Sequence, residues 1–553
     1  MNFKKSLFLF SILFSFAVYA QNMADYTDNW EGSLENSKTF SLKVEISSIE
    51  LDKAIFKISN ENDIFETQIK ANNSKEIQVP IGENSSFTGI LSDDGKEING
   101  FIKSGLLLYH LKLSKSDPLT YSGNWNILMV DELKSQHFYL SLENGDSEEY
   151  QAYPILADNR FTGTWCANFQ KENDEIHFSD FKTGLQFKGK LLSNEINLEI
   201  LLEGYLLTEI QLKKSTSPWR IGQMNVKPVD YDDSFSNLEK HIHSDSLPNT
   251  HSVLISKNGK IIYENYFHGY NENLPHDMKS ASKSISSAFV GLAKDHELFD
   301  NVNQSIFEFL PEEYQKHNEG LKSKIDIKSL LTMSSGLDAI DYGINSNSKS
   351  SATEDNYQMS QDWTASVLEA PMIHPPNKKA NYGSANPYLL GLAMDSLVDI
   401  PLELFVDQNL FQPLGISNYI IQTDLKGKPY FGGGMYLTPK DMLKFGEMYL
   451  NSGKVNEKQV LPKEWIEESF KNYRPLENTE DKNGYGYFWW HHIYEVNGKT
   501  IKSIEARGAG GQYIFIVPEL NIVSVITSGN FRNGKTQQPE SIFEKYILPV
   551  IVD

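Results

Sequence analysis

Residues 280–293 read SASKSISSAFVGLA, and this stretch decides the fold of the chain. Its apolar side chains recur at the spacing of one helix face, and they are Ile285, Ala288, Phe289 and Leu292. That period predicts a helix over 281–296, with Ser280 at its start and Lys283 three positions later. Because residues i and i+3 lie on one side of a helix, the Lys283 amine can reach the Ser280 hydroxyl. The stretch therefore offers a nucleophile beside a base.

The Ser-x-x-Lys spacing occurs three times in the sequence, so the surroundings have to choose among three serines. Ser179 lies in a region with the alternating pattern of strands, and Ser346 lies in a polar loop without a scaffold. Ser280 alone opens an apolar-periodic helix, where free backbone N–H groups and the positive helix end can stabilise an oxyanion. A buried polar setting can also lower the pKa of the neighbouring lysine toward base function. The alternative is that Ser280 only caps the helix.

A second candidate group is the side chain of Tyr382, in the sequence Tyr382-Gly383-Ser384. An apolar run follows it and predicts another helix over 386–398. A tyrosine at this position can share a proton with Lys283 and serve as a general acid or base. The alternative is a tyrosine that only packs in the core.

A glycine-rich segment comes third. Residues 506–512 read ARGAGGQ and lead into two runs typical of buried strands, 513–517 and 522–526. Glycine permits close approach of the backbone to a ligand, and a free N–H on such an edge can be an oxyanion donor. The alternative is a glycine-rich strand entry without a catalytic role. Another strand pair is predicted around the turn Asn258-Gly259. Strands at both ends with helices between them indicate an α+β domain. Further helices are predicted over 326–334, 439–452 and 462–470.

These segments together resemble the serine β-lactamase-like family of penicillin-recognising hydrolases. That family includes class C β-lactamases, D-Ala-D-Ala carboxypeptidases, serine esterases and aminohexanoate-oligomer hydrolases. The resemblance runs from about Val253 to the C-terminus and includes the spacing from Ser280 to Tyr382. The motifs that carry it are SASK at 280–283, LLTMSSGL at 330–337, PLG at 413–415, GGGMY at 432–436 followed by Asp441, and YGYFWW at 485–490.

The resemblance implies a fold and a set of roles. The domain is expected to be an antiparallel sheet flanked by helices, with a helical subdomain. Ser280 is expected to be acylated, while Lys283 and Tyr382 move protons. The N–H of Ser280 and that of Ala509, which follows Gly508, are expected to bind the oxyanion. No metal or organic cofactor is implied.

Two departures from the family pattern bear on specificity. The second motif reads Tyr-Gly-Ser, with Ser384 where penicillin-binding members have asparagine. The third begins with Ala506, where those members have the lysine or histidine that meets the substrate carboxylate. Arg507 is a candidate substrate-binding residue, but one position along a strand it should point to the opposite face. The pattern therefore favours an esterase or amidase over a true β-lactamase.

The N-terminal half predicts a different architecture, because short alternating runs and turn signals fill residues 25–214. A repeat is visible where Phe87-Thr88-Gly89 is matched by Phe187-Lys188-Gly189. We therefore expect tandem all-β modules, small barrels or sandwiches, before the hydrolase domain. The expected boundaries are 25–117 for module 1, 118–214 for module 2, 215–233 for a linker and 234–553 for the hydrolase domain.

Residues 1–20 have the pattern of a signal peptide: Lys4 and Lys5, an apolar run over 7–18 and Ala20 at the cut. We therefore expect an exported protein, periplasmic or secreted, without a stable membrane span. Cys166 is the only cysteine, which excludes an intramolecular disulfide and is typical of a buried structural thiol. The formal net charge of −22 argues against nucleic-acid partners.

The sequence thus predicts an exported serine hydrolase that cleaves an ester or amide through an acyl-enzyme on Ser280. Its expected partner is a small-molecule ester, amide or peptide, with glycan or protein contact through the β modules as a further option. Two alternatives stay open. One is a non-catalytic binding or scaffold protein with a degenerate hydrolase fold. The other is a D-amino-acid peptidase that acts on cell-wall peptides.

Overall fold

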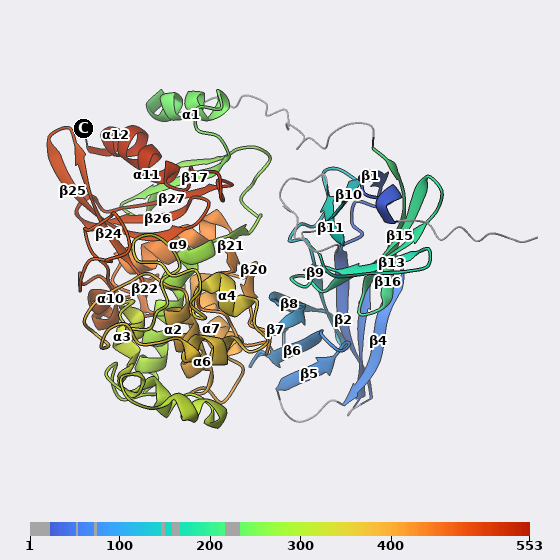
Figure 1. The fold of residues 1–553 in the computed structure, drawn as a ribbon, viewed down its shortest axis with the longest axis horizontal. Coiled ribbons are helices and arrows are strands. Elements are labelled where there is room, and N and C mark those ends of the chain that lie inside the picture. The colour runs from blue at the N-terminus through green and yellow to red at the C-terminus, as the bar shows by residue number, and fades with distance from the viewer. Residues whose placement is uncertain are drawn as a thin grey trace, which may run out of the picture. The chain divides into compact units, whose positions relative to one another are not determined.

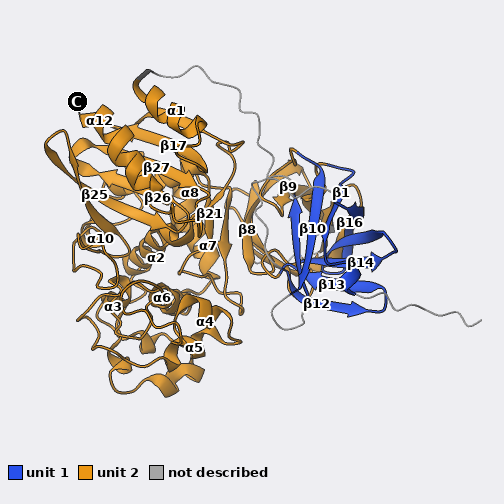
Figure 2. Cartoon of the chain, turned by 45° about the horizontal axis from the view of Figure 1, so that its top comes forward, with its two compact units in different colours: residues 1–36, 135–180, 185–220 blue, residues 37–134, 181–184, 221–553 orange. Residues whose placement is uncertain are grey.

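The computed structural model divides the chain into two compact units (Figure 2). It describes residues 23–50, 53–70, 75–144, 150–156, 166–215 and 233–552. Unit 1 consists of residues 1–36, 135–180 and 185–220, and unit 2 of residues 37–134, 181–184 and 221–553. The expected signal peptide over 1–20 lies outside the described residues, as does nearly all of the expected linker. Each unit is described by itself below.

Unit 1 is built on an eight-stranded antiparallel sheet with the order β11-β10-β1-β16-β15-β14-β13-β12. Buried and more exposed side chains alternate along its strands, as in the patterns of β14 and β15, so one face of each strand forms the core. Cys166, just before β12, is a free and buried thiol, as the sequence predicts. The strands are β1 (Asn29–Ser33), β10 (His137–Asn144), β11 (Tyr150–Leu156), β12 (Ala167–Glu172), β13 (Glu175–Ser179), β14 (Leu185–Leu191), β15 (Glu195–Leu202) and β16 (Tyr205–Lys214).

Unit 2 begins with a second antiparallel sheet, which has eleven strands and joins the N-terminal half of the chain to the C-terminal half. Strand β8 pairs with β20, so that Tyr109 lies opposite Ile420. The strands are β2 (Ser41–Glu50), β3 (Lys53–Ser59), β4 (Asp63–Lys70), β5 (Glu76–Pro80), β6 (Ser86–Leu91), β7 (Glu97–Ser104), β8 (Leu107–Asp117), β9 (Thr120–Asn126), β19 (His276–Asp277), β20 (Tyr419–Gln422) and β21 (Met435–Leu437).

The two β sheets do not follow the expected boundary between residues 117 and 118. That boundary falls in the turn of the β8–β9 hairpin, where Asp117 pairs with Thr120. A tight antiparallel hairpin keeps β9 beside β8, so β9 belongs to the first sheet. Strand β1 instead lies between β10 and β16 of the other sheet. The two repeats have therefore exchanged their equivalent first strands, which carry Trp30 and Trp125.

The hydrolase part of unit 2 contains a six-stranded antiparallel sheet with the order β18-β17-β27-β26-β25-β24. Strand β17 pairs with β27 near the C-terminus, so the strands at the two ends of this part meet in one sheet as the sequence predicts. The strands are β17 (Thr250–Lys257), β18 (Lys260–Tyr266), β24 (Trp490–Val496), β25 (Lys499–Gly508), β26 (Gln512–Val517) and β27 (Ile522–Ser528). The short pair β22 (Lys454–Val455) and β23 (Lys458–Gln459) stands apart.

Helices cover both faces of the six-stranded sheet (Figure 1). One apolar cluster joins the sheet to α2, α9 and the helical subdomain, and a second joins it to α1 and the C-terminal helices. The helices are α1 (Ser236–His243), α2 (Lys283–Asp295), α3 (Ile327–Leu331), α4 (Glu354–Gln358), α5 (Trp363–Glu369), α6 (Ala385–Asp395), α7 (Leu402–Val406), α8 (Gln412–Leu414), α9 (Pro439–Leu450), α10 (Lys463–Ser469), α11 (Gln538–Ile542) and α12 (Leu548–Val552). The predicted α+β architecture is confirmed.

Helix α2 is more deeply buried than an amphipathic pattern suggests, since its residues 283–293 are all buried. Two of its buried serines form hydrogen bonds inside the core, whereas Ser287 Oγ has no partner among the described residues. Ser284 Oγ donates to the carbonyl oxygen of Phe488 at 2.7 Å, and Ser286 Oγ donates to that of Phe431 at 3.3 Å. These bonds remove most of the cost of burying hydroxyl groups. Within the described ranges, no helix is long and apolar enough to cross a membrane.

Candidate active site

The segment that leads into α2 holds Ser280 on a tight turn. Ser280 lies in the 3-10 helix η3 (Lys279–Ser282), directly after β19. Lys279 has a φ of +50°, which a residue with a side chain adopts only when its surroundings enforce it. Asp277 Oδ1 accepts a hydrogen bond from the Lys279 N–H at 3.0 Å, and the Met278 N–H donates to the Met435 carbonyl at 2.9 Å. The turn leaves Ser280 partly exposed, just after strand β19.

Lys283 lies within direct reach of the candidate nucleophile, as its spacing predicts. Its Nζ donates to Ser280 Oγ at 2.7 Å and also to the carbonyl oxygen of Gly432. The side chain is 1% exposed. Burial lowers the pKa of the Lys283 amine, although the negative charges of Glu354 and Asp341 oppose the shift. An amine that gives up its proton more readily than a solvated lysine is suited to take the proton of Ser280.

Tyr382 completes the group of three. Lys283 Nζ lies 5.1 Å from the centroid of the Tyr382 ring, and the ring packs against Trp490 at 5.4 Å. Burial raises the pKa of Tyr382 above its ordinary value, and a hydrogen bond with the Ser280 side chain opposes that shift. The phenol therefore keeps its proton at neutral pH. That state suits an acid that protonates a leaving group.

The glycine-rich segment at the end of β25 lies against the Ser280 turn. A Cβ atom on Gly508 would stand 2.2 Å from the Met278 carbonyl oxygen, so only glycine allows this approach. Gly510 and Gly511 follow with φ of +88° and +91°, which turns the chain into β26. The two predicted oxyanion donors, the N–H groups of Ser280 and Ala509, thus belong to two segments that pack against each other at this point.

Ser384 occupies the N-cap position of α6, and its hydroxyl is buried. Its N–H donates to Asp341 Oδ2 at 2.7 Å, and its side chain is 1% exposed. Ser384 Oγ has no hydrogen-bond partner among the described residues. Burial together with the charge of Glu354 raises the pKa of Asp341 to about 6. Asp341, which the sequence reasoning missed, thus anchors the segment that carries Tyr382.

Arg507 requires a correction, because the structure does not place it as a substrate-binding residue. As the alternation of strand side chains predicts, it points away from the face of Ala506 and Gly508. Its Nε donates to Glu505 Oε2 at 2.7 Å, and its Nη1 lies 3.0 Å from Asp481 Oδ2 and 3.3 Å from Glu540 Oε1. Three carboxylates therefore hold Nε and Nη1 of the guanidinium, while its buried Nη2 has no hydrogen-bond partner among the described residues.

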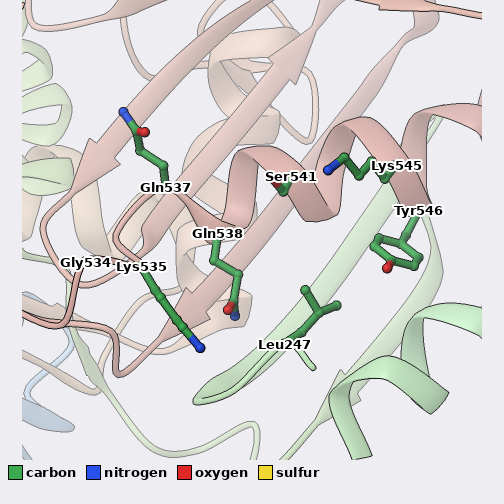
Figure 3. A pocket seen from close by; sticks show the side chains of 8 residues that line it. All are labelled: Leu247, Gly534, Lys535, Gln537, Gln538, Ser541, Lys545 and Tyr546. Carbon is green, nitrogen blue, oxygen red and sulfur yellow. The ribbon is translucent and has the colours of Figure 1, made fainter. Parts of the chain in front are cut away.

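Two further features lie outside these residues. A hollow of about 360 Å³ opens beside the C-terminal helices (Figure 3), and none of the predicted site residues lines it. Its lining residues are Leu247, Gly534, Lys535, Gln537, Gln538, Ser541, Lys545 and Tyr546. Over the described part of the chain, no three His, Cys, Asp or Glu side chains gather in a way that would hold a metal ion.

A buried histidine pair lies just ahead of the nucleophile turn. His251 Nδ1 and His276 Nε2 are 2.8 Å apart, and the Tyr270 ring stacks on His251 at 3.8 Å. Burial lowers the pKa of His276 to about 4, while Asp277 opposes the shift and Lys279 adds to it. Burial and the neighbouring His276 and His268 lower the pKa of His251 as well. Both rings are therefore neutral in the folded protein at neutral pH.

The pair predicts that stability falls in mild acid. The unfolded chain takes up protons on these histidines below pH ~6.5, whereas folded His276 stays neutral down to about pH 4. Folding is favoured above pH ~6.5, where His276 is neutral in both states. As the pH falls from ~6.5 toward 4, the unfolded state gains a proton that the folded state does not, and this costs on the order of 3 kcal/mol of stability. We expect the melting temperature of His276→Gln to change less than that of the parent between pH 8 and pH 5. His137→Gln, at an exposed site, is the control, and an equal acid loss in the parent and in His276→Gln contradicts the prediction.

Comparison with known proteins agrees with this geometry. A family model described as Beta-lactamase matches residues 248–543. An uncharacterized protein of Mycobacterium tuberculosis is 24% identical over 233 residues, which are 35% of this chain and 56% of that protein. The chain thus spans about half the length of the curated relatives it matches.

Solved structures of the same kind are also similar. A Bacillus anthracis protein assigned as a 6-aminohexanoate-dimer hydrolase has a TM-score of 0.46 and 19% identity, over 56% of this chain and 80% of that one. A Bacteroides dorei protein assigned as a β-lactamase has a TM-score of 0.46 and 17% identity, over 59% and 100%. A penicillin-binding protein of Bacillus halodurans has a TM-score of 0.42 and 17% identity, over 55% and 98%. The family match covers more than half of the 553 residues, and the chain belongs to the Beta-lactamase family of serine hydrolases.

Proposed function

We propose that the chain hydrolyses an ester or amide through an acyl-enzyme on Ser280. The observation that carries the proposal is the 2.7 Å contact between Lys283 Nζ and Ser280 Oγ, made by an amine that is 1% exposed. A lysine that served only in surface ion pairs would keep its amine in water. The Lys283 amine is instead buried against the Ser280 hydroxyl. Tyr382 stands beside both groups and supplies the acid that the reaction needs.

The proposed reaction has two halves. Ser280 Oγ attacks the substrate carbonyl carbon while its proton passes to Lys283, and the oxyanion is bound by the N–H groups of Ser280 and Ala509. The bond to the leaving group then breaks, and Tyr382 donates the proton that the leaving group takes. Lys283 returns a proton to Tyr382. Water attacks the acyl-enzyme by the reverse route, and its proton goes back to Ser280 Oγ when the acid is released.

The charges around the site favour a substrate without a free carboxylate. Ala506 brings no cation to the position where penicillin-binding members have one, and Arg507 is held by carboxylates. Lys279 Nζ is paired with Asp277 Oδ2 at 2.8 Å. Phe531 covers this lysine, with Lys279 Nζ 5.0 Å from its ring centroid, and the Phe531 side chain is 49% exposed. Lys182 Nζ lies 3.8 Å from the same Asp277 oxygen, so both lysines beside the turn are paired with one carboxylate, and Phe531 adds an apolar surface.

This arrangement predicts the outcome of a matched substrate pair, one ester with a free carboxylate and one with that group as a neutral amide. A charge-assisted hydrogen bond to a carboxylate contributes roughly 1.5–3 kcal/mol, about one to two decades in kcat/KM. Since that bond is absent, we expect near-equal kcat/KM for the two esters and slow nitrocefin turnover. A preference of more than about twentyfold for the acid, or efficient nitrocefin hydrolysis, would place a free cation in the site and overturn the prediction.

Labelling with a fluorophosphonate tests the function directly. We expect one adduct per chain, located on Ser280 by peptide mass spectrometry, and loss of that adduct in Ser280→Ala. If no serine probe labels the protein, the non-catalytic scaffold is favoured instead. Labelling combined with selective cleavage of peptides ending in D-Ala-D-Ala favours the D-amino-acid peptidase.

We also propose export to the periplasm or the medium, which the charged and apolar pattern of residues 1–20 supports. Expression of the full chain in a bacterial host, followed by N-terminal analysis, tests this proposal. A start at Gln21 is expected, and a protein that stays in the cytoplasm with residues 1–20 attached contradicts it.

Glycan or protein contact through the β sheets remains a second proposal, which an array of glycans would test.

A further inference from the structure

The main chain of Tyr382 is held by a side chain distant in sequence. Asn478 Oδ1 accepts a hydrogen bond from the Tyr382 N–H at 2.7 Å, and Asn478 Nδ2 donates to the Tyr382 carbonyl at 3.3 Å. The same Nδ2 donates to the Tyr342 carbonyl at 3.0 Å. Asn478 is 1% exposed and lies 96 positions from Tyr382. The Asn478 amide therefore bonds to both the N–H and the carbonyl of Tyr382, as the backbone of a neighbouring strand would in a sheet.

The loop that carries Asn478 is fixed on both sides. Before it, the Glu477 N–H donates to the Ala380 carbonyl at 2.8 Å, which ties the loop to the segment in front of Tyr382. After it, Asp481 Oδ2 lies 3.0 Å from Arg507 Nη1 and 2.9 Å from His492 Nδ1. Arg507 thus connects β25 to the loop. Because its loop is fixed on both sides, the Asn478 side chain can hold the Tyr382 main chain in one position.

Apart from the hydrogen bond with the Ser280 side chain and the Lys283 amine above its ring, the Tyr382 side chain is held by aromatic packing. Its neighbours Tyr342, Tyr485 and Trp490 are aromatic, and ring packing allows more sliding than a hydrogen bond does. The position of its hydroxyl therefore depends on where the main chain stands. Small errors in the placement of an acid reduce catalysis strongly, because proton transfer requires hydrogen-bond distance.

We propose that Asn478 is a positioning residue, which aligns Tyr382 to protonate the leaving group. The proposal rests on the proposed function and adds a residue that acts on one step of it. The proposal predicts that the effect of Asn478 depends on the leaving group of the substrate. An alkoxide leaving group needs the proton from Tyr382, whereas p-nitrophenolate leaves readily without it. Loss of the alignment should therefore slow alkyl esters far more than p-nitrophenyl esters.

The experiment compares an ethyl ester with the p-nitrophenyl ester of the same acid, using the full chain and Asn478→Ala. We expect kcat/KM for the ethyl ester to fall ~100-fold and kcat/KM for the p-nitrophenyl ester to fall less than ~10-fold, because kcat/KM reports the acylation half, in which the two leaving groups differ. In the Tyr382→Phe background, Asn478→Ala should add almost no further loss, since both changes remove one function. Equal losses on the two esters, or losses that multiply, overturn the inference.

Two more variants secure the comparison. Thr479→Ala is the matched control, because Thr479 Oγ1 bonds only inside the loop, to the carbonyl groups of Leu476 and Asp481. It should lower both activities by the same small factor. If Asn478→Ala does not fold, Asn478→Ser, which keeps one hydroxyl at the site, is measured instead, and an unchanged ratio of the two esters overturns the inference. If the parent protein cleaves neither ester, the proposed function fails rather than the role of Asn478.

Discussion

Replacement of Ser280 by alanine is expected to lower the hydrolysis of a p-nitrophenyl ester by roughly 10³- to 10⁶-fold, because it removes the atom that forms the acyl bond. The Ser280 hydroxyl contacts Lys283 and is partly exposed, so its removal should leave the fold intact. The measurement is kcat/KM together with a thermal melt. A melting temperature within a few degrees of the parent shows that the loss is chemical.

A second serine on the same segment provides the control. Ser284→Ala removes a hydroxyl of equal size whose bond goes to the Phe488 carbonyl, away from Ser280. We expect a small loss of stability, of about 1 kcal/mol, and an almost unchanged rate. Retained turnover in Ser280→Ala with an unchanged melt would move the nucleophile to another residue. Equal loss in both serine variants would show that the segment responds to any change.

On an alkyl ester, Lys283→Ala and Tyr382→Phe are each expected to lower kcat by ~10²- to 10⁴-fold, the usual contribution of a general acid or base. The double variant should lose less than the product of the two, since both side chains serve one proton relay around Ser280. Lys294→Ala, in the last turn of the same helix, is the control and should keep the parent rate. Losses that multiply would show that Lys283 and Tyr382 act independently.

The pH profile gives the same prediction another test. Burial lowers the pKa of Lys283, and the base must be neutral to accept the serine proton, so kcat/KM should rise with pH through that pKa. Tyr382 keeps its proton to high pH, because burial raises its pKa. The profile of Tyr382→Phe should therefore keep the rise that belongs to Lys283. A parent profile that falls between pH 6 and pH 9 contradicts the assignment of Lys283 as the base.

Local patterns in the sequence predicted the contact between Ser280 and Lys283. Ser280 and Lys283 are three positions apart on one segment, so their contact follows from helix geometry alone. Strand alternation likewise predicted that Arg507 points away from Ala506 and Gly508. Two of its three acidic partners could not be predicted, because Asp481 and Glu540 come from a loop and from α11.

Contacts between distant segments were beyond the sequence. Asn478 lies 96 positions from Tyr382, and no spacing in the chain indicates that bond. The alternating pattern of the N-terminal half indicated strands and their buried faces, but it does not specify which strand pairs with which. The exchange of β1 and β9 between the two sheets therefore went unpredicted. In the same way, the pattern gave no sign that β8 would continue into the sheet of β20 and β21.

The pairing of β8 with β20 has a consequence for biosynthesis. His110 on β8 bonds to the Ser417 carbonyl, 307 positions later, so this edge cannot be closed until most of the chain has left the ribosome. Such long-range pairing is slow, and an open strand edge invites association with other chains while it waits. The pairing of β8 with β20, rather than the formation of α2, should then be the slow step in the folding of newly made protein.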